Sequence, residues 1–331
     1  MNFLGEIISI SVAFSWTMSA LFFEIAGKRI GSLNVNIIRL FFALVLLGTM
    51  LFFTTGSPLP QHADASAWFW MVLSGLVGFV FGDLCLFYSY LIITARYSQL
   101  IMTLAPPFAA FFGWMIIGEN LSLSGFIGMA VTLAGIAISI LKRSDAKASH
   151  VSGGSNLTVV TENEKESKPK IKLHLPLKGV LLAIGGALGQ GLGIVLSKQG
   201  MLEYQESAAG HAEILKYLPF AATQIRIITG IIGFGLIIIL TGRSGLFRKS
   251  LSDKKGMSNT FFGSIFGPFL GVSLSLMAIQ YTSTAIASTI MATTPIIILV
   301  PYIFLYKKKI TGVEILGAIL SVAGVAIFFI G

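Results

Sequence analysis

Residues 103–141 read TLAPPFAAFFGWMIIGENLSLSGFIGMAVTLAGIAISIL, and residues 292–330 read ATTPIIILVPYIFLYKKKITGVEILGAILSVAGVAIFFI. They belong to two longer copies, Gly82–Leu141 and Gly271–Ile330, which align at a constant offset of 189 residues. Pro106 matches Pro295, for example, with no gap between the copies. Each copy holds two long apolar runs joined by a short polar turn. This pattern predicts a membrane unit that occurs twice, which is typical of transporters.

The composition indicates an integral membrane protein. The 331 residues are 55% hydrophobic and only 11% charged, with a mean hydropathy of +0.86, whereas soluble domains carry about 25% charged residues. The single cysteine, Cys85, excludes an intrachain disulfide and a cysteine metal cluster. The four histidines all fall in polar connections. We therefore expect no metal site and no cofactor.

Ten apolar runs are long enough to cross a bilayer, at about 20 residues each. They lie near residues 4–24, 33–54, 68–90, 97–117, 122–141, 178–198, 218–241, 259–281, 284–306 and 311–330. We expect an all-α integral membrane fold with ten transmembrane helices, arranged as two inverted five-helix repeats at residues 1–141 and 178–331. Residues 142–177 have mixed charge and almost no aromatic side chains, which predicts a polar, flexible linker.

The positions of lysine and arginine predict the orientation. With the N-terminus outside, nineteen of the 23 Lys and Arg residues fall in inner loops. These cations follow the first and third helices of the first half, but the second and fourth helices of the second half, as inverted halves would require. We expect an inner (plasma) membrane protein with both termini outside and the 142–177 linker in the cytoplasm. Orientation thus explains most of the net charge of +9, and no nucleic-acid partner is expected.

Three charged residues lie well within the predicted spans: Arg39, Asp83 and Arg226, with Glu24 at the edge of the first span. A charge near the bilayer centre costs at least about 2.5–3.5 kcal/mol, so each one needs a partner or a water-filled cavity. At about 1.5 Å per residue, Arg39 and Asp83 both lie roughly 9–10 Å from the inner face. An ion pair between them is therefore allowed. It would either tie two helices together or serve as a gate or coupling element.

Arg226 occupies the place in the seventh span that Arg39 occupies in the second. The residue aligned with Asp83, however, is Val272, so the second half supplies no equivalent acid. An arginine without an internal partner is suited to bind a carboxylate or phosphate of the cargo. The alternative is that it pairs with Glu213 or extends to the outer interface.

Other polar or aromatic residues within or near the spans complete the candidate site. Trp16 and Gln190 hold corresponding places in the first span of each half, and two prolines interrupt later spans at matching depths, where broken helices often face cargo. The candidates are Trp16, Arg226, Tyr88, Gln190, Thr103 and Gln280 for substrate binding, Arg39, Asp83 and Glu24 for coupling or gating, and Pro106 and Pro295 for helix breaks.

These features resemble the EamA-type branch of the drug/metabolite transporter superfamily. The resemblance rests on the early arginine in the second helix of each half, on Leu104-Ala105-Pro106, on Gly118-Glu119-Asn120-Leu121-Ser122 and on Leu133-Ala134-Gly135. It implies a ten-helix inverted-repeat fold with a central cavity and secondary transport of small metabolites, often efflux. The chain departs from the family in having Lys307–Lys309 where a glutamate would match Glu119. The outside position expected for its termini also differs, since family members commonly keep them in the cytoplasm.

The sequence therefore predicts a secondary transporter, not an enzyme, which moves a small polar organic metabolite by alternating access, with export as the expected direction. No ATP-binding motif is present, so coupling would be to protons, sodium or the solute's own gradient. One alternative is a flippase for a lipid-linked intermediate, which would need a laterally open groove. Another is a membrane-embedded enzyme, for which the spans offer Asp83 and Glu24 but no histidine.

Overall fold

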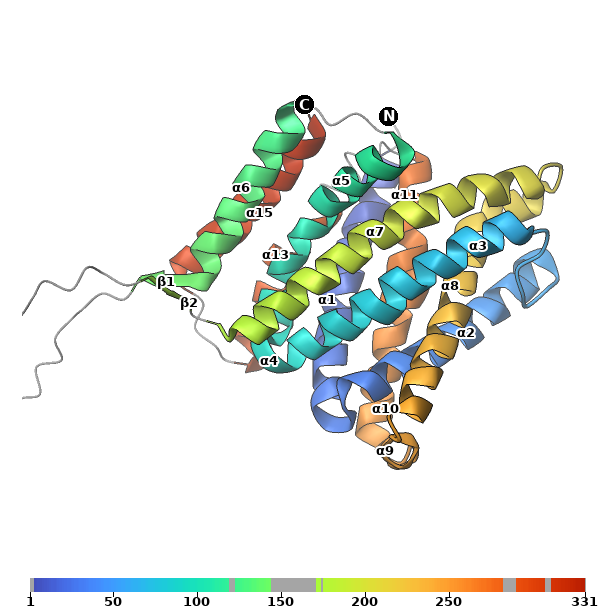
Figure 1. The fold of residues 1–331 in the computed structure, drawn as a ribbon, viewed down its shortest axis with the longest axis horizontal. Coiled ribbons are helices and arrows are strands. Elements are labelled where there is room, and N and C mark those ends of the chain that lie inside the picture. The colour runs from blue at the N-terminus through green and yellow to red at the C-terminus, as the bar shows by residue number, and fades with distance from the viewer. Residues whose placement is uncertain are drawn as a thin grey trace, which may run out of the picture.

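The computed structural model describes residues 3–118, 123–143, 171–173, 175–281, 290–306 and 311–330, and these are almost entirely helical (Figure 1). The first part of the chain forms α1 (Leu4–Ile30), α2 (Ser32–Thr55), α3 (Ala65–Ser74), α4 (Asp83–Ile101), α5 (Ala105–Ile117) and α6 (Leu123–Ile140). The second part forms α7 (Leu177–Ser207), α8 (Ala212–Leu240), α9 (Ser244–Ser250), α10 (Lys254–Ser264), α11 (Val272–Tyr281), α13 (Thr294–Ile297), α14 (Leu299–Tyr306) and α15 (Gly312–Ile330). Two short strands, β1 (Leu141–Arg143) and β2 (Ile171–Leu173), pair antiparallel at the two ends of the predicted linker.

Five helical stretches of the described residues are long and apolar enough to cross a membrane, as expected of an integral membrane protein built from helices. They are Leu4–Ile30, Ser32–Thr55, Ala65–Ile116, Leu177–Ser207 and Ala212–Leu240; shorter apolar helices cover Leu123–Ser139, Thr294–Phe304 and Gly312–Ile327. Several helices exceed the predicted spans: α1 continues to Ile30, α7 continues to Ser207 and α8 begins at Ala212. The polar end of α7 is rich in Glu and Gln, which have high helix propensity and keep the helix stable where the apolar run stops.

The long stretch Ala65–Ile116 folds back on itself at Thr94, which has φ 70° and ψ 159° inside α4. The hydroxyls of Ser89 and Ser98 lie 2.7 Å apart, and Gln99 Nε2 donates to Tyr90 Oη at 2.7 Å. Residues nine apart in a straight helix would be about 13.5 Å apart. The chain therefore reverses here, and the helical segments before and after Thr94 are antiparallel neighbours.

Both halves contain a π-helix at the same place in the repeat. The first is η1 (Gly75–Gly82), between α3 and α4, and the second is η3 (Ile265–Gly271), between α10 and α11. The residues that follow directly are Asp83 and Val272, which are aligned in the repeat. π-helical turns are rare and frequent at functional sites, and the apolar periodicity of the sequence does not reveal them.

Helices α6 and α15 pack closely, side by side, at one end of the molecule (Figure 1). A methyl group added at Gly135 would lie 2.5 Å from Ser321 N, and one added at Gly324 would lie 2.4 Å from Thr132 N. Gly135 and Gly324 are matching residues of the two repeats, and so are Thr132 and Ser321, because each pair is 189 residues apart. The two contacts are therefore related by exchange of the two halves. The contacts run from Ser139–Glu314 to Thr132–Ser321, so the two helices are antiparallel.

Glycines also bring α7 close to the first half. A methyl group at Gly189 would lie 2.6 Å from Gly82 Cα, and one at Gly193 would lie 3.0 Å from Gly78 Cα. Helix α7 thus packs along α3, η1 and α4, while α1 packs along α10, η3 and α11. Small residues permit such approach where lipid provides no hydrophobic drive for helices to associate. The result is a buried centre in which η1, α2, α7 and α8 meet.

Candidate functional site

The centre of the molecule holds a buried ion pair between Arg39 of α2 and Asp83, the first residue after η1. Arg39 Nη2 donates to Asp83 Oδ2, and its Nε donates to Asn36 Oδ1 at 3.0 Å. Gln190 of α7 donates from Nε2 to the other oxygen, Asp83 Oδ1, at 2.8 Å. Asn36 Nδ2 reaches the Asp83 carbonyl at 3.3 Å. Both carboxylate oxygens of Asp83 are therefore engaged, one by each half of the chain.

A second guanidinium, Arg226 of α8, lies beside this pair. Its side chain is only 4% exposed, and its charge centre stands 4.5 Å from the ring centre of Phe79 in η1. Arg39 approaches the same ring to 5.6 Å. Within the described part of the chain Arg226 makes no hydrogen bond or ion pair, and its Nε is buried without an acceptor. The site thus contains two guanidiniums and one carboxylate, and carries one positive charge in excess.

The local sequence explains why these groups meet. Gly78, in η1, leaves room for Arg226, because a methyl group there would lie 2.9 Å from Arg226 Nη2. The close contact of Gly189 with Gly82 brings the next residue of α7, Gln190, to Asp83. The alternative roles of Arg226 do not hold: it is buried, not extended to an interface, and it does not pair with Glu213.

A second polar network joins the two halves around Glu24, which is 1% exposed. Its Oε2 accepts from the backbone N–H of Ala95 at 2.9 Å and from the Tyr302 hydroxyl, and its Oε1 pairs with Lys28. Ala95 directly follows the reversal at Thr94, so the carboxylate anchors that turn.

The network continues to α15 through Arg96. Arg96 Nη2 lies 3.3 Å from Glu314 Oε1 and donates to the Tyr97 hydroxyl at 2.7 Å, and that hydroxyl in turn donates to Glu314. The Arg96 guanidinium also stands 5.7 Å from the Tyr302 ring centre. Helices α1, α4, α14 and α15 are thereby tied together at one end of the bundle.

A more exposed ion pair lies nearby, between Arg29 at the end of α1 and Asp253 at the start of α10. The Gly256 backbone N–H donates to Asp253 Oδ1 at 2.9 Å, and Arg29 binds both carboxylate oxygens. The Gly256 hydrogen bond, followed by that of Arg29, lowers the pKa of Asp253 below its usual range. This contact therefore weakens only in acid.

The other predicted site residues do not join the central cluster. Trp16 lies against η3, where a methyl group at Gly271 would come 2.6 Å from its ring, much as Gln190 lies against Gly82. Tyr88 is 40% exposed, with Lys178 Nζ 5.1 Å from its ring centre. Thr103 is buried and donates to the Leu100 carbonyl at 2.7 Å.

Three further candidates concern helix breaks and α11. Pro106 stands in the first turn of α5, directly after a 3₁₀ turn, η2 (Met102–Leu104), and Pro295 stands in the first turn of α13. The helical course thus changes at both prolines. Gln280 belongs to α11, but its side chain lies outside the described residues.

Sequence reasoning missed Asn36 and Phe79, which complete the cluster. Asn36 precedes Arg39 by three residues and Phe79 precedes Asp83 by four, so both spacings place them on the same helix face as the charged residue. That spacing is the signal that could have found them.

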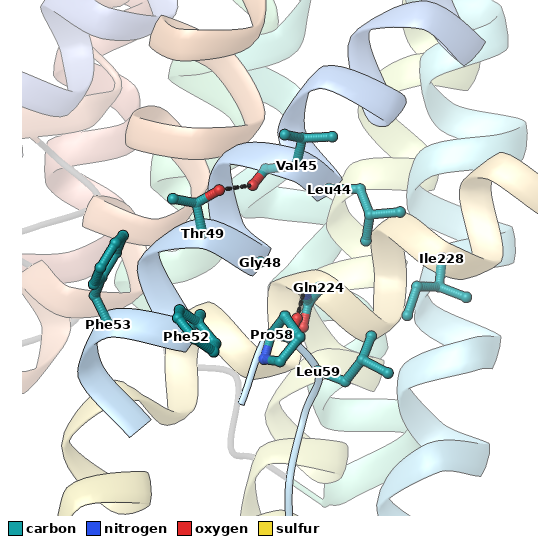
Figure 2. A pocket seen from close by; sticks show the side chains of 10 residues that line it. All are labelled: Leu44, Val45, Gly48, Thr49, Phe52, Phe53, Pro58, Leu59, Gln224 and Ile228. Atoms are coloured by element: carbon teal, nitrogen blue, oxygen red, sulfur yellow. Dashed lines mark hydrogen bonds between the residues drawn. The ribbon is translucent and has the colours of Figure 1, made fainter. Parts of the chain in front are cut away.

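A separate groove opens on the surface between α2 and α8 (Figure 2). Its volume is about 560 Å³, and its lining is mostly apolar: Leu44, Val45, Gly48, Thr49, Phe52, Phe53, Pro58, Leu59, Gln224 and Ile228. Gln224 Nε2 donates to the Pro58 carbonyl at 2.8 Å, while its Oε1 is buried without a partner. Gln224 and Arg226 are two residues apart on α8 and so point to nearly opposite sides. The groove and the charged cluster are therefore distinct.

Comparison with known proteins identifies the class. The model of the EamA-like transporter family matches residues 3–141 and 177–330, so the chain belongs to that family. An uncharacterised transporter of Bacillus subtilis (strain 168), YoaV, is 24% identical over 132 residues. That match covers 40% of this chain and 45% of the relative, less than half of either. A crystal structure described only as that of a protein has a TM-score of 0.58 at 14% identity, over 99% of this chain and 96% of its own, and shows the fold alone.

The matching family is described as one of transporters. Within the described residues no group of three or more His, Cys, Asp or Glu is placed to hold a metal ion.

Proposed function

We propose that this protein is a secondary transporter that moves a small polar organic metabolite by alternating access. Ten membrane spans would form two inverted five-helix repeats, residues 1–141 and 178–331, joined by the 142–177 linker. The family match to 3–141 and 177–330 supports this arrangement. The antiparallel packing of α6 on α15 supports it further, because those helices are the last of each repeat and would cross the membrane in opposite directions.

The observation that carries the proposal is the buried, charged cluster between the halves. Arg226 is 4% exposed and makes no hydrogen bond in the described chain, next to a carboxylate already committed to Arg39 and Gln190. A buried charged side chain within a membrane span is by default a candidate for the transport pathway. Arg226 and Gln190 would hold the cargo, and Trp16 would form a wall on the symmetry-related side.

The two buried networks suit the conformational change. The Arg39–Asp83 pair would act as the coupling or gating element, since Gln190 of the other half also binds Asp83. Glu24 would belong to a gate, because its contacts with Ala95 and Tyr302 join the two halves at one end of the bundle. Coupling to protons, sodium or the solute gradient is proposed, with export from the cell as the direction.

A lipid-linked flippase is the alternative that an observation favours. The groove between α2 and α8 is mostly apolar and open at the surface, and Phe53 in its lining is 81% exposed. It would seat an acyl or isoprenoid chain. The groove lies on the side of α8 away from Arg226, however. A lipid bound in the groove would therefore not bring its headgroup to the charged cluster. For this reason we favour a polar solute. We also propose that the protein is a transporter and not an enzyme.

Flux measurements in proteoliposomes test the proposal. A panel of labelled metabolites would identify a substrate, and Arg226→Ala would then lower its flux at least tenfold while the protein remains folded. Arg243→Ala, an exposed arginine just after α8, is the matched control and should leave flux unchanged. Undiminished flux in Arg226→Ala would remove its assigned role, and absence of any solute flux would refute the transporter.

A further inference from the structure

Each repeat has an arginine at the matching place of its second helix, but only the first repeat has an acid, Asp83, directly after its π-helix. Arg39 and Arg226 occupy matching places in the second helix of each half, and Asp83 and Val272 both follow a π-helix directly. In the first half the arginine and the acid form a buried ion pair. In the second half, α8 likewise packs on α11, which begins at Val272. The second repeat thus carries the matching arginine but no acid at the place that matches Asp83, and the Arg226 side chain packs on η1 of the first repeat.

The charges of the cluster define what is missing. Asp83 provides one negative charge for two guanidiniums, and its printed hydrogen bonds go to Arg39 and Gln190 and not to Arg226. Arg226 packs on η1, against Gly78 and the Phe79 ring, and its Nε is buried without an acceptor among the described residues. A guanidinium presents a planar fork that matches a carboxylate in a bidentate pair. One carboxylate on a bound solute would accept hydrogen bonds from Arg226 and would bring the net charge of the cluster to zero.

We propose that the cargo carries one carboxylate, which pairs with Arg226 and takes the place of the acid that the second repeat lacks at Val272. This inference rests on the proposed transport function and specifies its substrate class. A monocarboxylate balances the single excess charge. A phosphate monoester, at about −1.5 to −2, would over-compensate it, and a neutral solute would leave Arg226 unsatisfied.

The test uses binding, which does not depend on transport. The full chain in lipid nanodiscs would be unfolded thermally with a panel of small monocarboxylates, their neutral amides and dicarboxylates, at constant ionic strength. Monocarboxylates should stabilise the wild type and their amides should not. Arg226→Gln should weaken apparent monocarboxylate affinity at least about tenfold, the loss expected for one charge-assisted pair.

Val272→Asp provides the sharper variant, and Val272→Asn is its matched control. The new carboxylate should pair with Arg226, so Val272→Asp should be more stable than Val272→Asn without ligand, yet no longer respond to monocarboxylates. Val272→Asn should keep the response. Equal stabilisation by acids and amides, a carboxylate response that survives Arg226→Gln, or no carboxylate response at all would overturn the inference.

Failure of the inference and failure of the function have different signatures. If liposomes transport a neutral or cationic solute and carboxylates do not bind, the chain is a transporter without this anion site. If monocarboxylates bind through Arg226 but no solute crosses the membrane, the anion site stands and the transport function falls.

Discussion

At the scale of single residues, the Arg39–Asp83 pair is the feature whose loss should matter most. Both side chains are at most 6% exposed, and removal of one partner leaves the other charge buried. Either Arg39→Met or Asp83→Leu should therefore cost about 3–5 kcal/mol of stability. The double variant should cost less than the sum of the two, because it leaves neither charge alone. Denaturant unfolding in bicelles would measure this cycle.

The exposed pair between Arg29 and Asp253 is the control for that cycle. Arg29 is 43% exposed, so water and salt screen the interaction. Arg29→Gln should change stability much less than either buried variant. Comparable losses at both pairs would show that burial does not set the strength of the central ion pair.

At the scale of elements, the reversal at Thr94 stores backbone strain. Its φ of 70° with ψ of 159° is a conformation that glycine adopts freely and a β-branched residue rarely does. Thr94→Gly should relieve about 1–3 kcal/mol of strain and raise the melting temperature. Thr94→Ala retains a Cβ and should bring little gain. A Thr94→Gly variant less stable than Thr94→Ala would contradict the strain.

The glycine contact between α7 and η1 leads to the opposite expectation. A methyl group at Gly189 would meet the Gly82 backbone at 2.6 Å, whereas at Gly235 of α8 nothing lies within 4 Å. Gly189→Ala should push α7 from η1 and cost about 1–3 kcal/mol, and it should separate Gln190 from Asp83. Gly235→Ala should be neutral or slightly stabilising. Thermal unfolding of both variants, with transport of an identified substrate, would check this.

The sequence predicted the long apolar helices and allowed the Arg39–Asp83 ion pair, because apolar run length and rise per residue are local quantities. It did not predict η1 and η3, since a π-turn leaves apolar composition unchanged. The contact of Gln190 with Asp83 depends on how α7 is rotated against η1. Tyr88 follows Asp83 by five residues, about 140° around the helix, which explains why it lies outside the cluster.

At the scale of the whole molecule, orientation is a prediction from the cations alone. A reporter fused after Gly331 should lie outside the cell, and one fused to a chain ending at Arg143 should lie inside. Paired alkaline phosphatase and fluorescent protein fusions give opposite signals at each position. A cytoplasmic C-terminus would invert the assignment of faces, and the Glu24 network would then close the outer end.

The self-complementary contact of α6 with α15 suggests that the two halves can associate without a covalent link between them. Each helix presents the same glycine and hydroxyl pattern to the other, as two copies of one chain would in a symmetric dimer. Polypeptides 1–143 and 171–331, made separately in one cell, should consequently assemble and co-purify. The peptide bond between the halves would then serve to ensure equal amounts of each, while recognition resides in the helices themselves.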